Sequence, residues 1–218
     1  GSDICRAPLA FGTGRSNIPV MTDADHICAR PGRPRAFDKA EALAAITQVF
    51  RAKGYEGASL DDLTAAAGLS RSSFYGAFGS KHGALLAAVQ TYADKSYAAA
   101  RRAVDAAPDG RDAALRVVRG MSGAPLPGGG CLVINCVTEL APSDPEVSAI
   151  LRAHLGRYEA LLARTLAPDA PERAAPAAAA LLALAIGGLT LRKAGMGGEV
   201  TAAAEALIDD FTRAPAPA

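Results

Sequence analysis

The sequence predicts two short helices in succession, and their caps constrain the fold more than any other feature of the chain. Ser59 can cap the first helix, because its hydroxyl can accept a hydrogen bond from an amide N–H that the helix leaves free. Leu60, Leu63 and Ala67 then recur at helical spacing. Gly68 follows, and glycine tolerates the left-handed backbone with which many helices end. The pattern therefore predicts a short helix with a defined start and end.

A second short helix follows directly. Ser70 can cap a helix that runs from Arg71 to Phe78, and the two helices form a helix-turn-helix. In this motif the N-terminal residues of the second helix reach base edges in the major groove. A third helix opens at Ser80-Lys81, where a capped N-terminus beside a lysine suits a DNA phosphate. The residues of this region that we expect at DNA are Ser59, Ser70, Arg71, Ser72, Ser73, Tyr75 and Lys81.

This region resembles the DNA-binding domain of TetR-type transcriptional repressors over about Arg35 to Ala88, with no gap in the spacing. The resemblance rests on Phe50, Gly54-Tyr55, Ser59, Leu63, Ala67-Gly68-Leu69-Ser70, Phe74-Tyr75, Phe78, Lys81 and Leu85. It implies an all-α fold with an N-terminal three-helix helix-turn-helix DNA-binding domain and a C-terminal helical ligand-binding and dimerisation domain. We expect the tail and basic arm over 1–34, the DNA-binding domain over 35–82 and the C-terminal domain over 83–218. A helical core motif without a role in DNA binding is the alternative.

Basic residues gather in and beside the motif, although the formal net charge of the whole chain is only +1. Arg33-Pro34-Arg35 comes just before the first helix and resembles short basic arms that lie in the minor groove of A·T-rich DNA. We therefore expect Arg33 and Arg35 to contact DNA. A solvated charged linker is the alternative for this segment.

The first 31 residues show no apolar periodicity and no signal-peptide pattern. Gly1-Ser2 resembles the remnant of a cleaved purification tag, and Met21 is an alternative natural start. The four cysteines are unevenly placed, which favours a reducing cytoplasm over a disulfide framework. Their spacing and the scattered histidines also argue against a zinc site.

The rest of the chain is expected to be helical. The predicted helices cover about 81–104, 111–121, 131–140, a segment capped by Asp144 that continues to about 162, 174–194 and 199–212. The stretch from Ala174 to Leu191 has no charge and approaches membrane-spanning length. Because Pro176 and Gly187-Gly188 interrupt it, we expect a buried helix and no membrane span. The family resemblance implies a homodimer interface over Ala174 to Phe211, and a buried monomer core is the alternative.

The resemblance also implies a small-molecule effector that enters the C-terminal domain and weakens operator binding. The segment from Gly130 to Asn135 resembles one in a subset of these repressors, some of which respond to electrophiles through a cysteine at this point. Cys131 would lie in the first turn of a helix, where the partial positive charge favours a reactive thiolate. A small apolar core residue is the alternative for both Cys131 and Cys136. The expected pocket residues are Tyr97, Met121, Cys131, Asn135, His154 and Tyr158, with Tyr92 as a further candidate.

The sequence contains no catalytic set that spacing can assign. It has no phosphate-binding glycine loop, no Ser-His-Asp or paired-carboxylate arrangement, and no motif for a metal or cofactor. We therefore expect a cytoplasmic, dimeric regulator, and no enzyme, that binds a palindromic double-stranded DNA operator and is released by a small molecule. A DNA-binding activator or an architectural protein without ligand control is the alternative.

Overall fold

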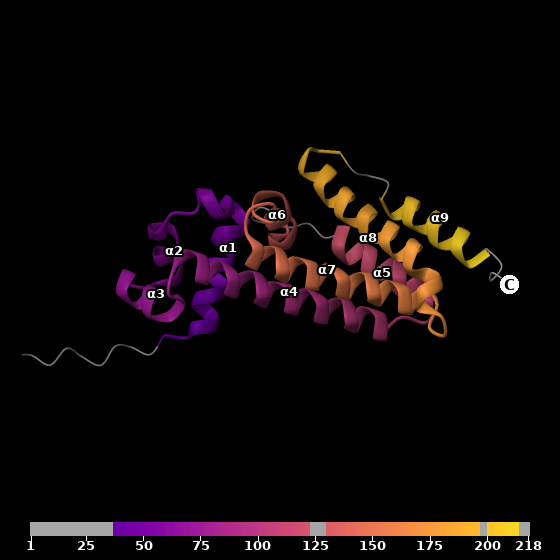
Figure 1. Cartoon of the computed structure of the whole chain (residues 1–218), viewed down its shortest axis with the longest axis horizontal. Coiled ribbons are helices and arrows are strands. Elements are labelled where there is room, and N and C mark those ends of the chain that lie inside the picture. The colour runs from indigo at the N-terminus through magenta and orange to yellow at the C-terminus, as the bar shows by residue number, and fades with distance from the viewer. Residues whose placement is uncertain (1–36, 123–129, 197–199, 214–218) are drawn as a thin grey trace, which may run out of the picture. The chain divides into compact units, whose positions relative to one another are not determined.

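The structure is a computed structural model that describes residues 37–122, 130–196 and 200–213. These residues form α-helices and no strand, which confirms the predicted all-α fold (Figure 1). The helices are α1 (Lys39–Gly57), α2 (Leu60–Ala67), α3 (Arg71–Phe78), α4 (Lys81–Asp105), α5 (Gly110–Ser122), α6 (Leu132–Glu139), α7 (Pro145–Leu166), α8 (Pro171–Lys193) and α9 (Val200–Arg213).

The caps of α2 and α3 are formed as the sequence predicts. The Ser59 hydroxyl accepts a hydrogen bond from the Asp62 amide at 3.0 Å, and the Asp62 carboxylate accepts one from the Ser59 amide at 3.0 Å. Gly68 ends α2 in the left-handed conformation, with φ 63° and ψ 30°. The Ser70 hydroxyl then accepts a hydrogen bond from the Ser73 amide at 3.1 Å. These local bonds fix the turn between the two helices.

Large apolar side chains hold the first four helices together. Phe50 of α1, Leu63 of α2, Phe74 of α3 and Leu85 of α4 are fully buried. The rings of Phe74 and Phe78 lie with their centroids 5.3 Å apart, so the inner face of α3 is anchored on this core. Because these residues occupy one face of α3, its other face is left at the surface.

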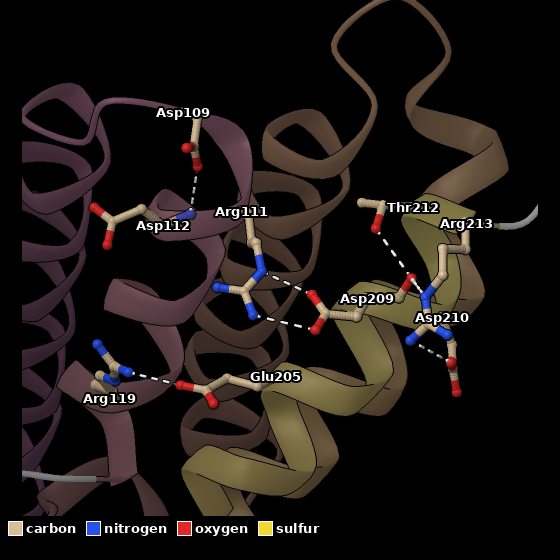
Figure 2. A network of polar contacts seen from close by, with 9 residues as sticks. All are labelled: Asp109, Arg111, Asp112, Arg119, Glu205, Asp209, Asp210, Thr212 and Arg213. Atoms are coloured by element: carbon tan, nitrogen blue, oxygen red, sulfur yellow. Dashed lines mark hydrogen bonds and ion pairs between the residues drawn. The ribbon is translucent and has the colours of Figure 1, made fainter.

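The C-terminal helices pack around a second group of buried side chains. Val118 of α5, Leu162 of α7, Leu181 of α8 and Ile208 of α9 are fully buried. Two exposed ion pairs also join α9 to α5, as Figure 2 shows. Arg111 donates to both carboxylate oxygens of Asp209 at 2.7 and 3.2 Å, and Arg119 donates to Glu205 at 2.9 Å.

Helix α8 differs from its predicted form. It begins at Pro171 rather than near Ala174, and neither Pro176 nor Gly187-Gly188 interrupts it. Pro176 lies on the exposed side close to the start of the helix, so the hydrogen bond that it removes concerns a carbonyl near the surface. The helix predicted over about 174–194 is therefore formed, because one missing hydrogen bond near an end does not outweigh the tertiary packing of α8.

Helix α8 is also long and apolar enough, by length and composition, to cross a membrane. The core helices of water-soluble proteins pass the same test, and 39% of its most apolar window is buried inside the structure. Its buried residues, Leu181 and Ala185 among them, pack against the helices of the second core. The apolar character of α8 is therefore used, at least in part, within the helical bundle.

Gly188 of α8 lies close against Val200 at the start of α9. A Cβ atom at this position would lie 2.1 Å from Cγ2 of Val200. We expect Gly188→Ala to lower the free energy of unfolding by about 1–3 kcal/mol, because the added methyl group must push the two helices apart. Urea unfolding followed by circular dichroism measures this loss.

Gly156→Ala is the matched control. Gly156 lies on the exposed side of α7, and a Cβ there would meet no other atom within 4 Å. This substitution should raise the free energy of unfolding by about 0.5–1 kcal/mol, since alanine costs less backbone entropy in a helix. Equal effects of the two substitutions would contradict the close packing at Gly188.

Candidate nucleic-acid interface and helical cavity

The N-terminal half of α3 presents hydrogen-bonding side chains at the surface. Arg71, Ser72 and Tyr75 are exposed, and Ser73 is half-buried. The Arg71 guanidinium donates to Asp61 of α2 at 2.7 Å. Because the Arg71 and Asp61 side chains are 65% and 74% exposed, this ion pair adds little stability, and a competing anion can replace it at small cost.

The serine hydroxyls of this region already have partners. The Ser70 hydroxyl lies 3.0 Å from that of Ser72 and donates to that of Ser73 at 2.9 Å. Ser59 is engaged in the cap of α2. These contacts hold the side chains in one arrangement before any ligand is bound. Their predicted contacts with DNA would therefore be made from a preformed surface.

Lys81 lies at the first position of α4, beside this surface. Its ammonium group is 4.4 Å from the centroid of the Tyr55 ring, a cation–π contact that restrains the side chain. The Ser80 hydroxyl accepts a hydrogen bond from the Gly83 amide at 2.8 Å and so caps α4. The predicted phosphate contact of Lys81 thus has a helix N-terminus next to it. Arg33 and Arg35, the predicted arm residues, lie outside the described residues.

A cavity of about 230 Å³ lies between α4, α5, α6, α7 and α8. Most of its lining is apolar, and the side chains that bring polar groups to it are Tyr92, Ser96, Arg116, Cys131, His154 and Tyr158. Of the predicted pocket residues, Met121, Cys131, His154 and Tyr158 lie in this lining. Their binding of an effector remains a prediction.

Tyr97 and Asn135 lie outside the lining. The Tyr97 ring packs edge-on against Tyr158, with centroids 5.6 Å apart, and the Arg157 guanidinium covers it at 4.0 Å. Asn135 instead faces α1: its amide nitrogen donates to the Arg51 carbonyl at 3.3 Å, and its oxygen accepts from Lys193.

Ser96 and Arg116 also line the cavity, although neither was expected there from the sequence. Ser96 lies one helical turn after Tyr92, so the helical spacing of α4 could have placed it on the same face. Arg116 enters the lining from α5, and its guanidinium is held by Asp112 at 2.5 Å and by the Ala106 carbonyl at 3.2 Å. No group of three or more metal-binding side chains is found in the part of the chain that the structure describes.

The two cysteines of α6 have different surroundings. Cys131 is the N-cap, one residue before the predicted first turn, with φ −87° and ψ 123°; it is half-buried in the cavity lining. Burial raises the pKa of the neighbouring Tyr92 hydroxyl, and contact with Cys131 raises it further. Cys136 is buried outside the lining, and burial raises the pKa of its thiol to about 12, with a smaller contribution from Glu139. Cys136 is therefore a protonated, unreactive core residue at neutral pH.

Helix α6 connects the cavity to α1, the first helix of the DNA-binding domain. Val133 and Ile134 of α6 line the cavity. At the end of the same helix, the Glu139 carboxylate accepts hydrogen bonds from the backbone amides of Tyr55 at 3.1 Å and Glu56 at 2.9 Å. These amides follow Gly54, where the backbone of α1 leaves the helical conformation with φ 73° and ψ −179°. One short helix thus contacts both the cavity and the first helix of the DNA-binding domain.

Two further contacts join the same parts of the molecule. The Arg51 Nε donates to the Gly130 carbonyl at 2.9 Å, next to the start of α6. Between α4 and α7, His82 Nε2 lies 2.7 Å from an oxygen of Asp144, and this carboxylate also caps α7. A displacement of α6 or α7 would therefore change the contacts of α1 and of the start of α4.

Replacing Glu139 tests the α6–α1 connection. We expect Glu139→Ala to speed hydrogen exchange of the Tyr55 and Glu56 amides and to lower the free energy of unfolding by about 1–3 kcal/mol, because two amides lose a charged acceptor. Glu172→Ala, which removes an exposed carboxylate from the first turn of α8, is the control and should leave both amides unchanged. Unchanged exchange in Glu139→Ala would contradict the proposed contact.

Known proteins share both the sequence of this domain and the fold of the chain. Residues 42–89 match the family model described as bacterial regulatory proteins, tetR family. The uncharacterized HTH-type transcriptional regulator YezE of Bacillus subtilis (strain 168) is 33% identical over 120 residues, which cover 54% of this chain and 62% of YezE. The chain thus spans less than two thirds of that relative's length.

Solved structures extend the likeness to the C-terminal helices. A TetR-family transcriptional regulator from Cytophaga hutchinsonii has a TM-score of 0.72 at 21% identity, over 79% of this chain and 93% of the other. A cysteine mutant of the TetR-family regulator CifR, complexed with a 26bp double-strand operator DNA, has a TM-score of 0.67 at 27% identity, over 84% of this chain and 99% of the other. These relatives are transcriptional regulators, and the likeness covers both the helix-turn-helix and the cavity-bearing helices. Residues 42–89 therefore resemble the tetR family of bacterial regulatory proteins, and the chain has the fold of TetR-family transcriptional regulators.

Proposed function

We propose that this chain is a cytoplasmic transcriptional repressor that binds a palindromic DNA operator as a homodimer and is released when a small molecule fills the cavity. The observation that carries the proposal is the exposed, hydrogen-bonding N-terminal half of α3, held by the buried Phe74 and Phe78 on its other face. That arrangement is the one by which a recognition helix enters the major groove. The structure of CifR with operator DNA supports this use of the fold.

The outward faces of α8 and α9 are the proposed dimer surface. Ala183 is exposed on α8, and a Cβ added at Gly187 would meet no atom within 4 Å. The exposed residues of α9 include Ala202, Ala203 and Ala206. Small side chains let a second pair of helices approach closely. Two-fold symmetry then places two α3 helices on one face of the duplex, about one helical turn apart or more.

Release follows from the position of α6. A molecule that fills the cavity acts on Val133 and Ile134, and α6 carries this displacement to α1 through Glu139. The ligand shifts the equilibrium only if it binds the released arrangement better than the DNA-bound one.

A DNA-binding activator or an architectural protein without ligand control is the alternative. In footprinting, broad coverage of DNA in place of one short palindrome would identify an architectural protein.

Substitutions on the α3 surface test the DNA-binding proposal. Arg71→Ala should weaken operator binding by about 1–3 kcal/mol if the guanidinium forms two hydrogen bonds to a base. Lys81→Ala should weaken binding to all sequences alike and reduce the slope of affinity against salt concentration, since it removes a phosphate contact. Fluorescence anisotropy with operator and random duplexes measures both effects. Operator affinity equal to wild type in both variants would show that this surface does not bind DNA.

We also propose a covalent route of release, because Cys131 lies in the cavity lining at the N-terminus of α6. An adduct on its sulfur would occupy cavity volume and displace the helix, since packed interiors do not absorb added groups cheaply. Benzoquinone should release the wild-type protein from operator DNA and leave Cys131→Ser bound. Mass spectrometry locates the adduct, and equal release of both proteins would exclude Cys131 as the reactive group.

A further inference from the structure

His154 lines the cavity, and one of its ring nitrogens has no hydrogen-bond partner. His154 is 5% exposed, and its Nδ1 atom is the only buried side-chain nitrogen or oxygen of the described residues that has no hydrogen-bond partner. Buried polar atoms are nearly always bonded, because leaving one unpaired costs free energy. The His154 ring lines the cavity and is held edge-on against Tyr158, with centroids 5.0 Å apart. The ring is therefore fixed in place with an unused hydrogen-bonding atom.

The imidazole of His154 is neutral at physiological pH. Burial and, to a smaller extent, the nearby Arg157 guanidinium lower its pKa to about 4, against a smaller opposing effect of Asp94. A neutral imidazole has one donor and one acceptor nitrogen. A hydroxyl group can satisfy either kind, because it both donates and accepts.

The remaining lining selects against charged ligands. Arg116 is the one Asp, Glu, Lys or Arg side chain among the described residues that line the cavity, and Asp112 and the Ala106 carbonyl already occupy its guanidinium. Ser96 donates its hydroxyl hydrogen to the Ala93 carbonyl at 3.0 Å. A carboxylate or an ammonium ion would thus enter an apolar space without a free counter-ion, and burying such a charge is costly.

The volume and the lining of the cavity further restrict which ligands can bind. A dry apolar cavity of about 150 Å³ admits benzene. The present cavity, of about 230 Å³, has room for a substituted benzene ring but is smaller than the sites of drug-sized molecules. The Tyr92, Tyr158 and His154 rings in the lining offer faces and edges for contact with an aromatic ring.

We propose that the cavity binds an uncharged, compact phenol and that the imidazole of His154 forms a hydrogen bond with its hydroxyl group. This inference rests on the proposed function only in treating the cavity as the effector site. Binding itself needs neither DNA nor a second chain.

Isothermal titration calorimetry of the full chain, without DNA, tests the proposal with three probes of nearly equal size: 4-ethylphenol, ethylbenzene and 4-ethylbenzoate. The wild-type protein should bind 4-ethylphenol about tenfold more tightly than ethylbenzene, because its hydroxyl gains a hydrogen bond with the His154 imidazole. 4-Ethylbenzoate should bind most weakly, since its charge finds no counter-ion. His154→Leu should remove the preference for 4-ethylphenol while keeping ethylbenzene binding.

A spectroscopic measurement covers the case in which His154→Leu does not fold. In wild-type protein with ¹⁵N-labelled histidine, 4-ethylphenol should shift an imidazole nitrogen resonance of His154, and ethylbenzene should leave both nearly unchanged. Equal affinities for the two probes in wild type, tightest binding of the benzoate, or a preference that persists in a folded His154→Leu would overturn the proposal. Phenol binding that does not release operator DNA would uphold the site and contradict the proposed ligand control alone.

Discussion

The carboxylate of Glu139 closes a break in α1, and the functional account depends on this contact. Gly54 takes the backbone out of the helix, which leaves the next two amides without helical partners, and an α6 side chain supplies the missing acceptor at 3.1 and 2.9 Å. A charged acceptor for two backbone amides is a strong interaction. Since α6 also lines the cavity, the first helix of the DNA-binding domain and the cavity cannot be repacked independently.

The apolar packing also links the N-terminal helices to the helices around the cavity. One continuous group of buried residues includes Phe50 of α1 and Phe74 of α3 together with Leu132 of α6 and Leu151 of α7. Helix α4 supplies buried residues to this group, and Tyr97 and Val104 near its other end pack against the second group. The predicted boundary between domains at residue 82 therefore crosses a shared core. Interiors this closely packed transmit a displacement more readily than they absorb it.

What the sequence could predict was local. Ser59, Gly68 and Ser70 act on amides and carbonyls within a few residues, so their roles follow from residue type and spacing. Residue type and spacing do not predict the long-range contacts. Glu139 accepts a hydrogen bond from an amide 84 residues away, and Arg111 donates one to Asp209 across 98 residues. Tyr97 and Asn135, which were expected in the pocket, lie outside its lining for the same reason. Helical spacing predicts which residues share a face of a helix, but it does not predict which neighbouring helix packs against that face.

The central claim is that two copies of this chain read one palindromic operator through α3. Selection of bound duplexes from a random-sequence pool, followed by sedimentation of the protein with the selected DNA, tests it most directly. The account predicts an enriched inverted repeat whose half-sites lie about one helical turn or more apart, bound by an even number of chains. Enrichment of a single half-site bound by one chain, or no enrichment over random DNA, would contradict it.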